Sequence, residues 1–357
     1  MKLNIIHNED CRSGIKKLPD NSVHCIVSPP PYFKLRDYDI DGQIGLEDTP
    51  EQYVNEIVSV FRESRRVLRD DGTLWLIIGD SYAGSGKGFG DINPNPKQAS
   101  NKGTQSGTLK PSKIEGLKPK DLIGIPWMVA FALRADGWYL RKDNIWHKPN
   151  PMPESVTDRC TTSHEYIFHF SKSAKYYYDA DAIKQPITDA TVFRMAQQLE
   201  DQKGSDRVTG KPNGNMKAVG PGRTPRKGID DRGGNQGSEK GIPAMAINGK
   251  GVNGHSGYYN QAGELIGGGM ANKKSVWTVT TKPFKEAHFA TFPPDLIVDC
   301  IKAGCPKDGI VLDPFMGAGT TGMVARKLDR NYIGFELNPD YIKIANNRIH
   351  EEIGIFI

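Results

Sequence analysis

The feature that most constrains this chain is a run of small residues between two short apolar segments near its C-terminus. The apolar residues 310–312 predict a short buried strand that ends at residue 313. Gly317 and Gly319 follow, and glycine lets a backbone turn tightly and approach a ligand that a Cβ would exclude. Residues 321–328 predict a helix whose first free N–H groups face the same ligand. Strand, glycine turn and helix together predict a nucleotide-type pocket in an α/β sheet.

Two carboxylates stand at the ends of predicted strands in this region. Asp313 ends the first strand, and Glu336 follows a second apolar run at residues 332–335. Open α/β sheets bind ligands at the carboxyl ends of their strands, where an acidic residue can accept two ribose hydroxyls. No Gly-Lys-Ser/Thr follows the glycines, which argues against a phosphate-cradling P-loop. Simple packing of a helix on a strand through glycine stays an alternative, and the two carboxylates favour a ligand site over it.

The string Asp-Pro-Phe-Met-Gly-Ala-Gly-Thr-Thr-Gly at residues 313–322 resembles the Phe-x-Gly-x-Gly element of S-adenosylmethionine-dependent DNA amino-methyltransferases. The resemblance implies S-adenosylmethionine as cofactor, S-adenosylhomocysteine as product and no metal. It implies cofactor contacts at Asp10, Asp313, Phe315, Gly317, Gly319, Thr320, Glu336 and Asn338, with Thr291 and Phe292 near the methionine end. Asp10 follows a predicted strand at residues 2–7 and would reach the adenine amino group. Its alternative role is the N-cap of a helix over residues 12–18, and both roles can coexist.

A proline-rich loop at residues 28–33 follows a second predicted buried strand, residues 23–27. Consecutive prolines cannot pair in a sheet, and they hold an extended loop whose carbonyls can accept hydrogen bonds. The loop resembles the Asp/Asn/Ser-Pro-Pro-Tyr catalytic loop of the same methyltransferases. The resemblance implies that the Pro30 carbonyl holds a target amine while Tyr32 stacks on the base. The predicted catalytic residues are Pro29, Pro30, Pro31 and Tyr32.

Pro29 departs from the pattern of the family. Counted without gaps, it stands where the family has Asp, Asn or Ser, and proline offers no side-chain acceptor. Ser28 lies one residue earlier and substitutes only if the loop shifts. A lost acceptor costs roughly 1–3 kcal/mol, which is about tenfold to hundredfold in rate. A protein that binds DNA and cofactor but turns over weakly is therefore an alternative to an efficient enzyme.

The departure at position 29 also removes the usual cue to the target base. Adenine N6 is favoured over cytosine N4 on overall likeness to the family alone. In either case the resemblance implies a base flipped out of the duplex. Residues predicted around that base are Ser28, Phe33, Arg36, Trp146 and Lys148, with Asp80 and Ser81 in the pocket wall. For Arg36 a surface ion pair is an equal alternative, and for Trp146 a place in the core.

The remaining pattern alternates helices and strands, which predicts an α/β fold. The predicted elements are helices at 50–69, 121–135, 296–303 and 341–352 and strands at 73–78, 138–146, 164–170 and 275–279. The resemblance implies a doubly wound, mostly parallel sheet, the Rossmann-like methyltransferase fold, in the permuted order with the catalytic loop first. Residues 1–184 would form the catalytic half and residues 275–357 the cofactor-binding half.

Residues 185–274 differ in composition, because glycine is frequent, apolar periodicity vanishes and Lys and Arg recur. A disordered insertion is one interpretation. The other is a target-recognition region whose cations neutralise phosphates of double-stranded DNA. Residues 84–118, rich in Gly, Ser, Asn and Lys, are predicted to form a mobile loop.

Composition sets the outer limits of the function. The 357 residues carry a net charge of +5 and a mean hydropathy of −0.53, which is typical of a soluble protein and permits binding to nucleic acid. No apolar run predicts a membrane span or a signal peptide. Five widely spaced cysteines without Cys-x-x-Cys favour free thiols in a reducing cytoplasm over a zinc site or disulfides. The resemblance implies a prokaryotic protein or a phage-encoded one in the host cytoplasm. A homodimer is compatible with the resemblance, and methylation of RNA or of a protein amide is the rival activity.

Overall fold

The computed structural model describes residues 1–35, 37–38, 40–83, 116–188, 270–281 and 292–354. The chain divides into two compact units, one of Met1–Asp179 with Lys274–Ile357 and one of Ala180–Lys273. The described part of the second unit holds a short 3-10 helix, η2 (Asp181–Ile183), and an antiparallel pair of two-residue strands, β6 (Gln185–Pro186) and β7 (Met270–Ala271). The predicted basic recognition region at 189–269 and most of the predicted loop at 84–118 lie outside the described residues.

In the part of the first unit that the structure describes, the strands form an eight-stranded sheet of order β1-β10-β9-β2-β3-β5-β4-β8. Its strands are β1 (Ile5–Asn8), β2 (Val23–Ser28), β3 (Leu68–Ile78), β4 (Tyr139–His147), β5 (His164–Ser171), β8 (Val276–Thr278), β9 (Ile310–Asp313) and β10 (Asn331–Glu336). Neighbours pair in parallel except where β5 lies between β3 and β4. The predicted mostly parallel α/β sheet is confirmed.

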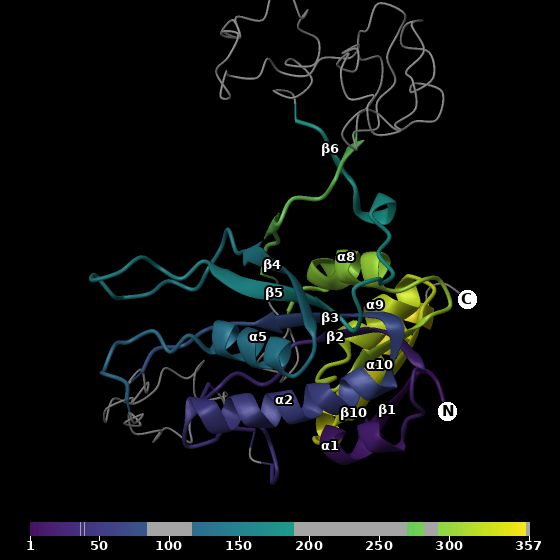
Figure 1. The fold of residues 1–357 in the computed structure, drawn as a ribbon, viewed down its shortest axis with the longest axis horizontal. Coiled ribbons are helices and arrows are strands. Elements are labelled where there is room, and N and C mark those ends of the chain that lie inside the picture. Colours follow the sequence, from purple (N-terminus) through teal and green to yellow (C-terminus); the bar gives the residue numbers. More distant parts are fainter. Residues whose placement is uncertain (36, 39, 84–115, 189–269, 282–291, 355–357) are drawn as a thin grey trace, which may run out of the picture. The chain divides into compact units, whose positions relative to one another are not determined.

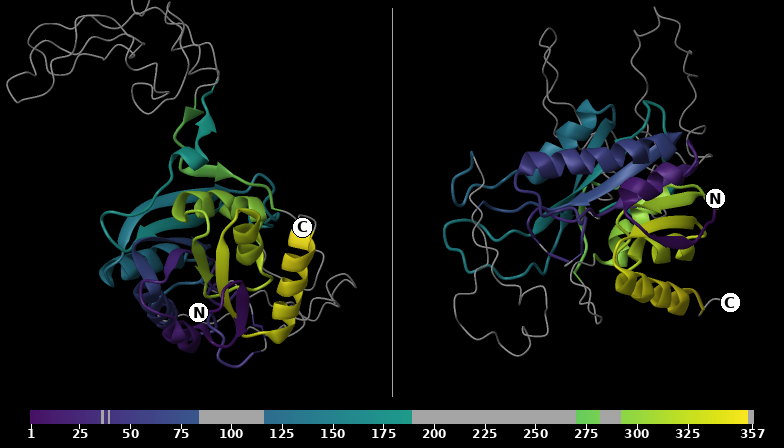
Figure 2. Two further views of the ribbon diagram at one scale, coloured as in Figure 1. Left: turned by 90° about the vertical axis from the view of Figure 1, so that its right-hand side faces the viewer. Right: turned by 90° about the horizontal axis from the view of Figure 1, so that it is seen from below.

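Helices cover both faces of this sheet (Figures 1 and 2). One face carries α1 (Cys11–Gly14), the 3-10 helix η1 (Ile15–Lys17), α2 (Pro50–Val67) and α5 (Ile125–Ala135). The other carries α8 (Pro294–Gly304), α9 (Thr320–Lys327) and α10 (Pro339–Gly354). A sheet with helices on both faces binds its ligands beyond the carboxyl ends of its strands.

Helix α2 begins as the sequence predicts and ends earlier. Thr49 Oγ1 accepts from the Gln52 amide, and the Gln52 side chain accepts from the Thr49 amide, so the expected capping box is present. The helix ends at Val67 because Leu68 already pairs with Val23 as the first residue of β3. The prediction of helix to residue 69 and of a strand only from residue 73 is therefore wrong.

Helix α5 begins four residues after its predicted start. Gly124, with φ of 85°, is its left-handed N-cap, and Pro126 occupies its first turn. The amides of Gly124 and Ile125 donate to the carboxylate of Asp80 at 3.0 and 3.1 Å. Asp80 thus caps this helix and does not line the pocket described below.

Candidate functional site

A pocket of about 590 Å³ opens where the carboxyl ends of the central strands meet. Its volume is in the range of small-molecule and cofactor sites. The proline loop after β2 and the glycine loop after β9 both line it, because β2 and β9 are adjacent parallel strands with Ile26 opposite Leu312. The predicted meeting of the two loops at neighbouring strand ends is confirmed.

A buried carboxylate joins the two loops beneath this pocket. Ser28 Oγ donates to Asp313 at 2.9 Å, and the Thr321 hydroxyl donates to the same carboxylate at 2.6 Å. The amide of Phe315 is a third donor at 3.0 Å. Burial raises the pKa of Asp313 to about 6, although these hydrogen bonds lower it. Neither Ser28 nor Asp313 is among the lining residues, so their predicted contacts with base and cofactor are replaced here by contacts with each other.

Glu336 organises the glycine loop from the end of β10. Its two carboxylate oxygens accept from the Gly317 amide at 2.8 Å and the Asn338 amide at 2.9 Å. Burial raises its pKa, and the backbone donors oppose that rise. A carboxylate has about four acceptor positions, so this arrangement leaves room for two hydroxyl donors from the pocket. The predicted residues Phe315, Gly317, Glu336 and Asn338 all line the pocket.

Thr320 and Gly319 have different positions at the start of α9. Thr320 lines the pocket, and its Oγ1 accepts from Arg348 at 2.8 Å. Gly319 is the left-handed N-cap of the helix and faces α10, where an added Cβ would lie 2.8 Å from the Cβ of Ala345. Gly319 is therefore required by helix packing, and the structure does not place it in the pocket lining.

Asp10 both caps a helix and lines the pocket. Its carboxylate accepts from the Arg12 amide at 2.7 Å and from the guanidinium of Arg12, which also bonds to Glu56. Burial alone would raise the pKa of Asp10, but the hydrogen bonds and charge of Arg12 hold it below its usual value. The N-cap role is shown, while its contact with a cofactor stays a prediction.

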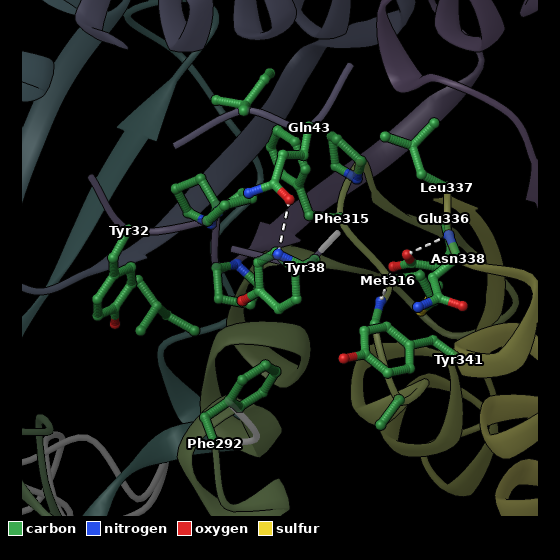
Figure 3. A pocket seen from close by; sticks show the side chains of 18 of the residues that line it. Tyr32, Tyr38, Gln43, Phe292, Phe315, Met316, Glu336, Leu337, Asn338 and Tyr341 are labelled. Carbon is green, nitrogen blue, oxygen red and sulfur yellow. Dashed lines mark hydrogen bonds between the residues drawn. The ribbon is translucent and has the colours of Figure 1, made fainter. Parts of the chain in front are cut away.

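Aromatic and apolar side chains complete this end of the pocket. Figure 3 shows Tyr38, Phe315 and Tyr341 around the space beside Glu336, with Phe292 below. Tyr38 and Tyr341 meet edge to face with their ring centroids 6.3 Å apart. Neither tyrosine is singled out by the sequence patterns, because each lies in a loop or at a helix start. Arg36 and Thr291, both predicted near the site, lie outside the described residues.

Tyr32 stands at the opposite end of the pocket (Figure 3). Its hydroxyl donates to Glu165 at 2.6 Å, and burial together with the charge of Glu165 raises its pKa well above the ordinary value. The neighbouring Pro31 carbonyl accepts from the Tyr53 hydroxyl at 2.7 Å. The Pro30 carbonyl accepts no hydrogen bond from residues that the structure describes. It is therefore an acceptor that this rigid loop leaves for a ligand.

Phe33 points away from the site. Its side chain is 2 % exposed and packs against Tyr53 with ring centroids 5.6 Å apart. The prediction that it contacts the base is wrong, because the loop turns after Tyr32 and places the next side chain in the core between the sheet and α2. Pro29, Pro30 and Pro31 do line the pocket.

A charged group closes the end of the pocket that Tyr32 lines, which we name the target end because the target base is predicted there. Trp146 is 4 % exposed, its indole N–H donates to the Val279 carbonyl at 2.8 Å, and Lys148 Nζ lies 4.4 Å from the centroid of its ring. Lys148 also forms an ion pair with Glu165. Trp146 therefore takes both the core and the pocket-wall position that the sequence leaves open. Glu165 lines the pocket but is not among the site residues predicted from the sequence. Its position opposite Trp146 in the neighbouring strand β5 is the feature that points to it.

Among the described residues, no group of three or more His, Cys, Asp or Glu side chains is arranged to hold a metal ion. None of the helices described is long and apolar enough to cross a membrane.

A family model described as DNA methylase, covering N6 and N4 enzymes, matches residues 23–347 of this chain. The chain belongs to this family. The DNA methylase is 41 % identical over 344 residues to the Type II methyltransferase M.Cfr9I of Citrobacter freundii, covering 96 % of this chain and 86 % of the relative. It is 39 % identical over 340 residues to M.SmaI of Serratia marcescens, covering 95 % and 88 %. The predicted family, an amino-methyltransferase that uses S-adenosylmethionine, is thus confirmed.

Solved structures show the same fold. The PvuII cytosine-N4-specific DNA methyltransferase matches with a TM-score of 0.54 and 14 % identity, over 98 % of this chain and 90 % of that one. A Thermus thermophilus protein assigned as a DNA modification methylase, in complex with S-adenosyl-L-methionine, matches with a TM-score of 0.52 and 18 % identity, over 98 % and 95 %. These neighbours confirm the Rossmann-like fold of the DNA methylase.

The residues of the pocket fit S-adenosylmethionine. Glu336 and Asp10 supply acceptors for hydroxyl and amino hydrogens, and Phe315 and Tyr341 supply faces for an aromatic ring. The pocket continues from these residues to Tyr32 and the free Pro30 carbonyl. One cavity can therefore hold a nucleoside at one end and a second planar group at the other.

Proposed function

We propose that this DNA methylase transfers a methyl group from S-adenosylmethionine to the exocyclic amino group of a base flipped out of double-stranded DNA at a specific sequence. The observation that carries the proposal is the single pocket that joins the glycine loop of Phe315 and Gly317 to the proline loop of Pro30 and Tyr32. A base inside a duplex cannot reach a recessed pocket of this kind, so the proposal includes flipping.

The cofactor supplies an activated methyl group when it is bound at the Glu336 end. The chain's own residues then orient the amine. The Pro30 carbonyl accepts one amino hydrogen, and the Tyr32 ring, fixed through its hydroxyl to Glu165, stacks on the base. The rigid proline loop holds both groups in one orientation, and the hydrogen bond from Tyr53 to the Pro31 carbonyl anchors it to α2. Orientation of this kind supplies a large part of the rate in a direct transfer.

Two bases present a suitable amine. Adenine N6 is our first candidate on the overall likeness to the family, although no residue in the pocket selects it. Cytosine N4 is the second candidate, and the PvuII enzyme, a fold neighbour specific for cytosine N4, supports it. We further propose that the protein acts in a bacterial cytoplasm beside a companion endonuclease, as one half of a restriction-modification pair. Whether it is a single chain or a homodimer stays a prediction.

The test is to incubate the purified protein with unmethylated plasmid DNA and methyl-labelled S-adenosylmethionine, then digest the DNA and identify the labelled nucleoside by mass. We expect N6-methyldeoxyadenosine or N4-methyldeoxycytidine. Tyr32→Ala should abolish labelling, whereas the matched Tyr139→Ala change at an exposed position of β4 should preserve it. Label found only in RNA or protein would overturn the proposal.

The weakly catalytic alternative has its own test. Ser28 cannot substitute for a side-chain acceptor at position 29, because its hydroxyl is buried and donates to Asp313. Pro29→Ser restores the residue type expected from the family. A rate at least tenfold above that of the natural protein would favour the alternative, and an unchanged or lower rate would show that the loop already works with proline.

A further inference from the structure

Three polar side chains from separate parts of the chain meet at the target end of the pocket. Tyr32 comes from the loop after β2, Lys148 from the segment after β4, and Glu165 from β5. The Tyr32 hydroxyl donates to Oε2 of Glu165 at 2.6 Å, and Lys148 Nζ donates to Oε1. All three line the pocket, so the carboxylate they share faces the space next to the proline loop.

The carboxylate retains acceptor capacity in this position. Glu165 has about four lone-pair positions, and Tyr32 and Lys148 occupy one each. The side chains of Glu165 and Lys148 keep 16 % and 19 % of their surface exposed, which is enough for contact with a bound group. The Tyr32 hydroxyl remains protonated because its pKa is raised, so it stays a donor to Glu165.

The backbone is shaped to allow this grouping. Gly79 follows β3 directly beneath it, and an added Cβ would lie 2.8 Å from Cε2 of Tyr32 and 3.2 Å from Cγ of Glu165. Real Cβ atoms do not approach a ring atom at 2.8 Å. The glycine therefore makes room for Tyr32 and Glu165 to lie together.

The target amine has two hydrogens, and the side chains of the proline loop before Tyr32 offer no acceptor for either. The Pro30 carbonyl can take one hydrogen, Pro29 has no side-chain acceptor, and the Pro31 carbonyl is occupied by Tyr53. An amine that forms a bond to a methyl carbon gains positive charge, and a nearby carboxylate stabilises that charge. Glu165 is the acidic side chain at this end of the described pocket lining.

We propose that Glu165 is a catalytic residue that accepts the second hydrogen of the target amine and stabilises the positive charge that develops on nitrogen. The inference rests on the proposed function. The amino nitrogen forms the new bond to the methyl carbon with its lone pair. The carbon–sulfur bond breaks with its electron pair going to sulfur. The extra proton on nitrogen passes to the Glu165 carboxylate and from there to water. Lys148 and Tyr32 position that carboxylate.

The test compares Glu165→Gln with Tyr32→Phe in single-turnover methylation of unmethylated plasmid DNA. The glutamine keeps the size of the side chain and removes the charge, while the phenylalanine keeps the stacking ring and removes only the hydrogen bond to Glu165. We expect a loss of hundredfold or more for Glu165→Gln and less than tenfold for Tyr32→Phe. Equal losses would mean that Glu165 only holds Tyr32 in place, and a wild-type rate in Glu165→Gln would also overturn the inference.

Binding of S-adenosylhomocysteine, measured by calorimetry, separates a chemical defect from a folding defect. We expect both variants to bind it within about twofold of the wild type. If Glu165→Gln does not bind S-adenosylhomocysteine, Glu165→Asp is measured in its place. The aspartate keeps the negative charge but moves the carboxylate away from the amine, so the same hundredfold loss of rate is expected. A second readout is rescue: Pro29→Ser in the Glu165→Gln background should recover at least tenfold, and no recovery would count against the inference. An inactive wild-type protein would instead refute the proposed function.

Discussion

The hydroxyl of Ser28 donates a 2.9 Å hydrogen bond to the carboxylate of Asp313, although 285 positions separate the two residues in the sequence. Both are buried, and the carboxylate also accepts from Thr321 and from the amide of Phe315. One buried group therefore fastens the proline loop to the glycine loop and to the first turn of α9. The relative position of the two ends of the pocket depends on it.

The first prediction concerns the pH dependence of stability. The pKa of Asp313 is about 6 in the folded protein and near 3.8 in an unfolded chain, so folding favours the protonated form. Its contribution is present in full below about pH 4 and is lost as pH rises through 6, a change of roughly 3 kcal/mol. Asp313→Asn should remove this part of the dependence. Urea denaturation between pH 4 and 7 measures it, and parallel profiles for both proteins would contradict the assignment.

The second prediction uses two glycines with nearly the same backbone conformation. Gly319 and Gly124 cap α9 and α5 with φ of 76° and 85°, but only Gly319 has Ala345 within reach of an added Cβ. Gly124→Ala should lower the free energy of unfolding only by the strain of a left-handed backbone at alanine, about 1–2 kcal/mol. Gly319→Ala adds about 1–3 kcal/mol of overpacking and should weaken cofactor binding. Denaturation measures the free energy of unfolding of both variants, and calorimetry measures their cofactor binding. Equal losses of stability would show that α10 shifts to make room for the added methyl group.

The third prediction tests the carboxylate of the glycine loop. Glu336→Gln leaves one oxygen for the Gly317 and Asn338 amides and none for a ribose. The affinity for S-adenosylhomocysteine should fall by about tenfold to hundredfold, since a hydrogen bond to a charged group is worth about 1.5–3 kcal/mol. Glu352→Gln, at the exposed ion pair with Lys327, is the control and should bind normally. Normal binding by both variants would exclude Glu336 from the cofactor site.

The fourth prediction separates catalysis from cofactor binding. Tyr53→Phe removes the 2.7 Å hydrogen bond to the Pro31 carbonyl and keeps the buried ring. The methylation rate should fall by about tenfold, the effect of losing about 1.4 kcal/mol of orientation, while the affinity for S-adenosylhomocysteine is unchanged. Tyr139→Phe at an exposed position is the matched control. If the affinity for S-adenosylhomocysteine falls as much as the rate, the substitution has disturbed the fold and not only the orientation of the proline loop.

Local signals carried most of the fold and the centre of the site. The glycine loop, Glu336 and the proline loop follow predicted buried strands, and a ligand site at such strand ends follows from sheet geometry. What the sequence does not reveal is the direction of a side chain at a strand end. Ser28 and Asp313 therefore lie beneath the pocket and not on it. Phe33, predicted at the base, points into the core for the same reason: the sequence does not show which way its side chain turns after Tyr32.

Long-range pairing explains the other differences. Glu165 is 133 positions from Tyr32, and only the register of β4 with β5 places it opposite Trp146. Leu68 continues the helical pattern of α2, but its pairing with Val23 makes it the first residue of β3. In both cases the position is set by pairing with a strand that is distant in the sequence, so a short stretch of sequence does not reveal it.

The placement of β9 and β10 between β1 and β2 has a consequence for the synthesis of this protein. A ribosome that has made the first three hundred residues has produced β1 without its neighbour and β2 with one side unpaired. The proline loop then exists, but Phe315, Gly317 and Glu336, which line the other end of the pocket, are still missing. The pocket is complete only after the last strands have inserted at the middle of the sheet.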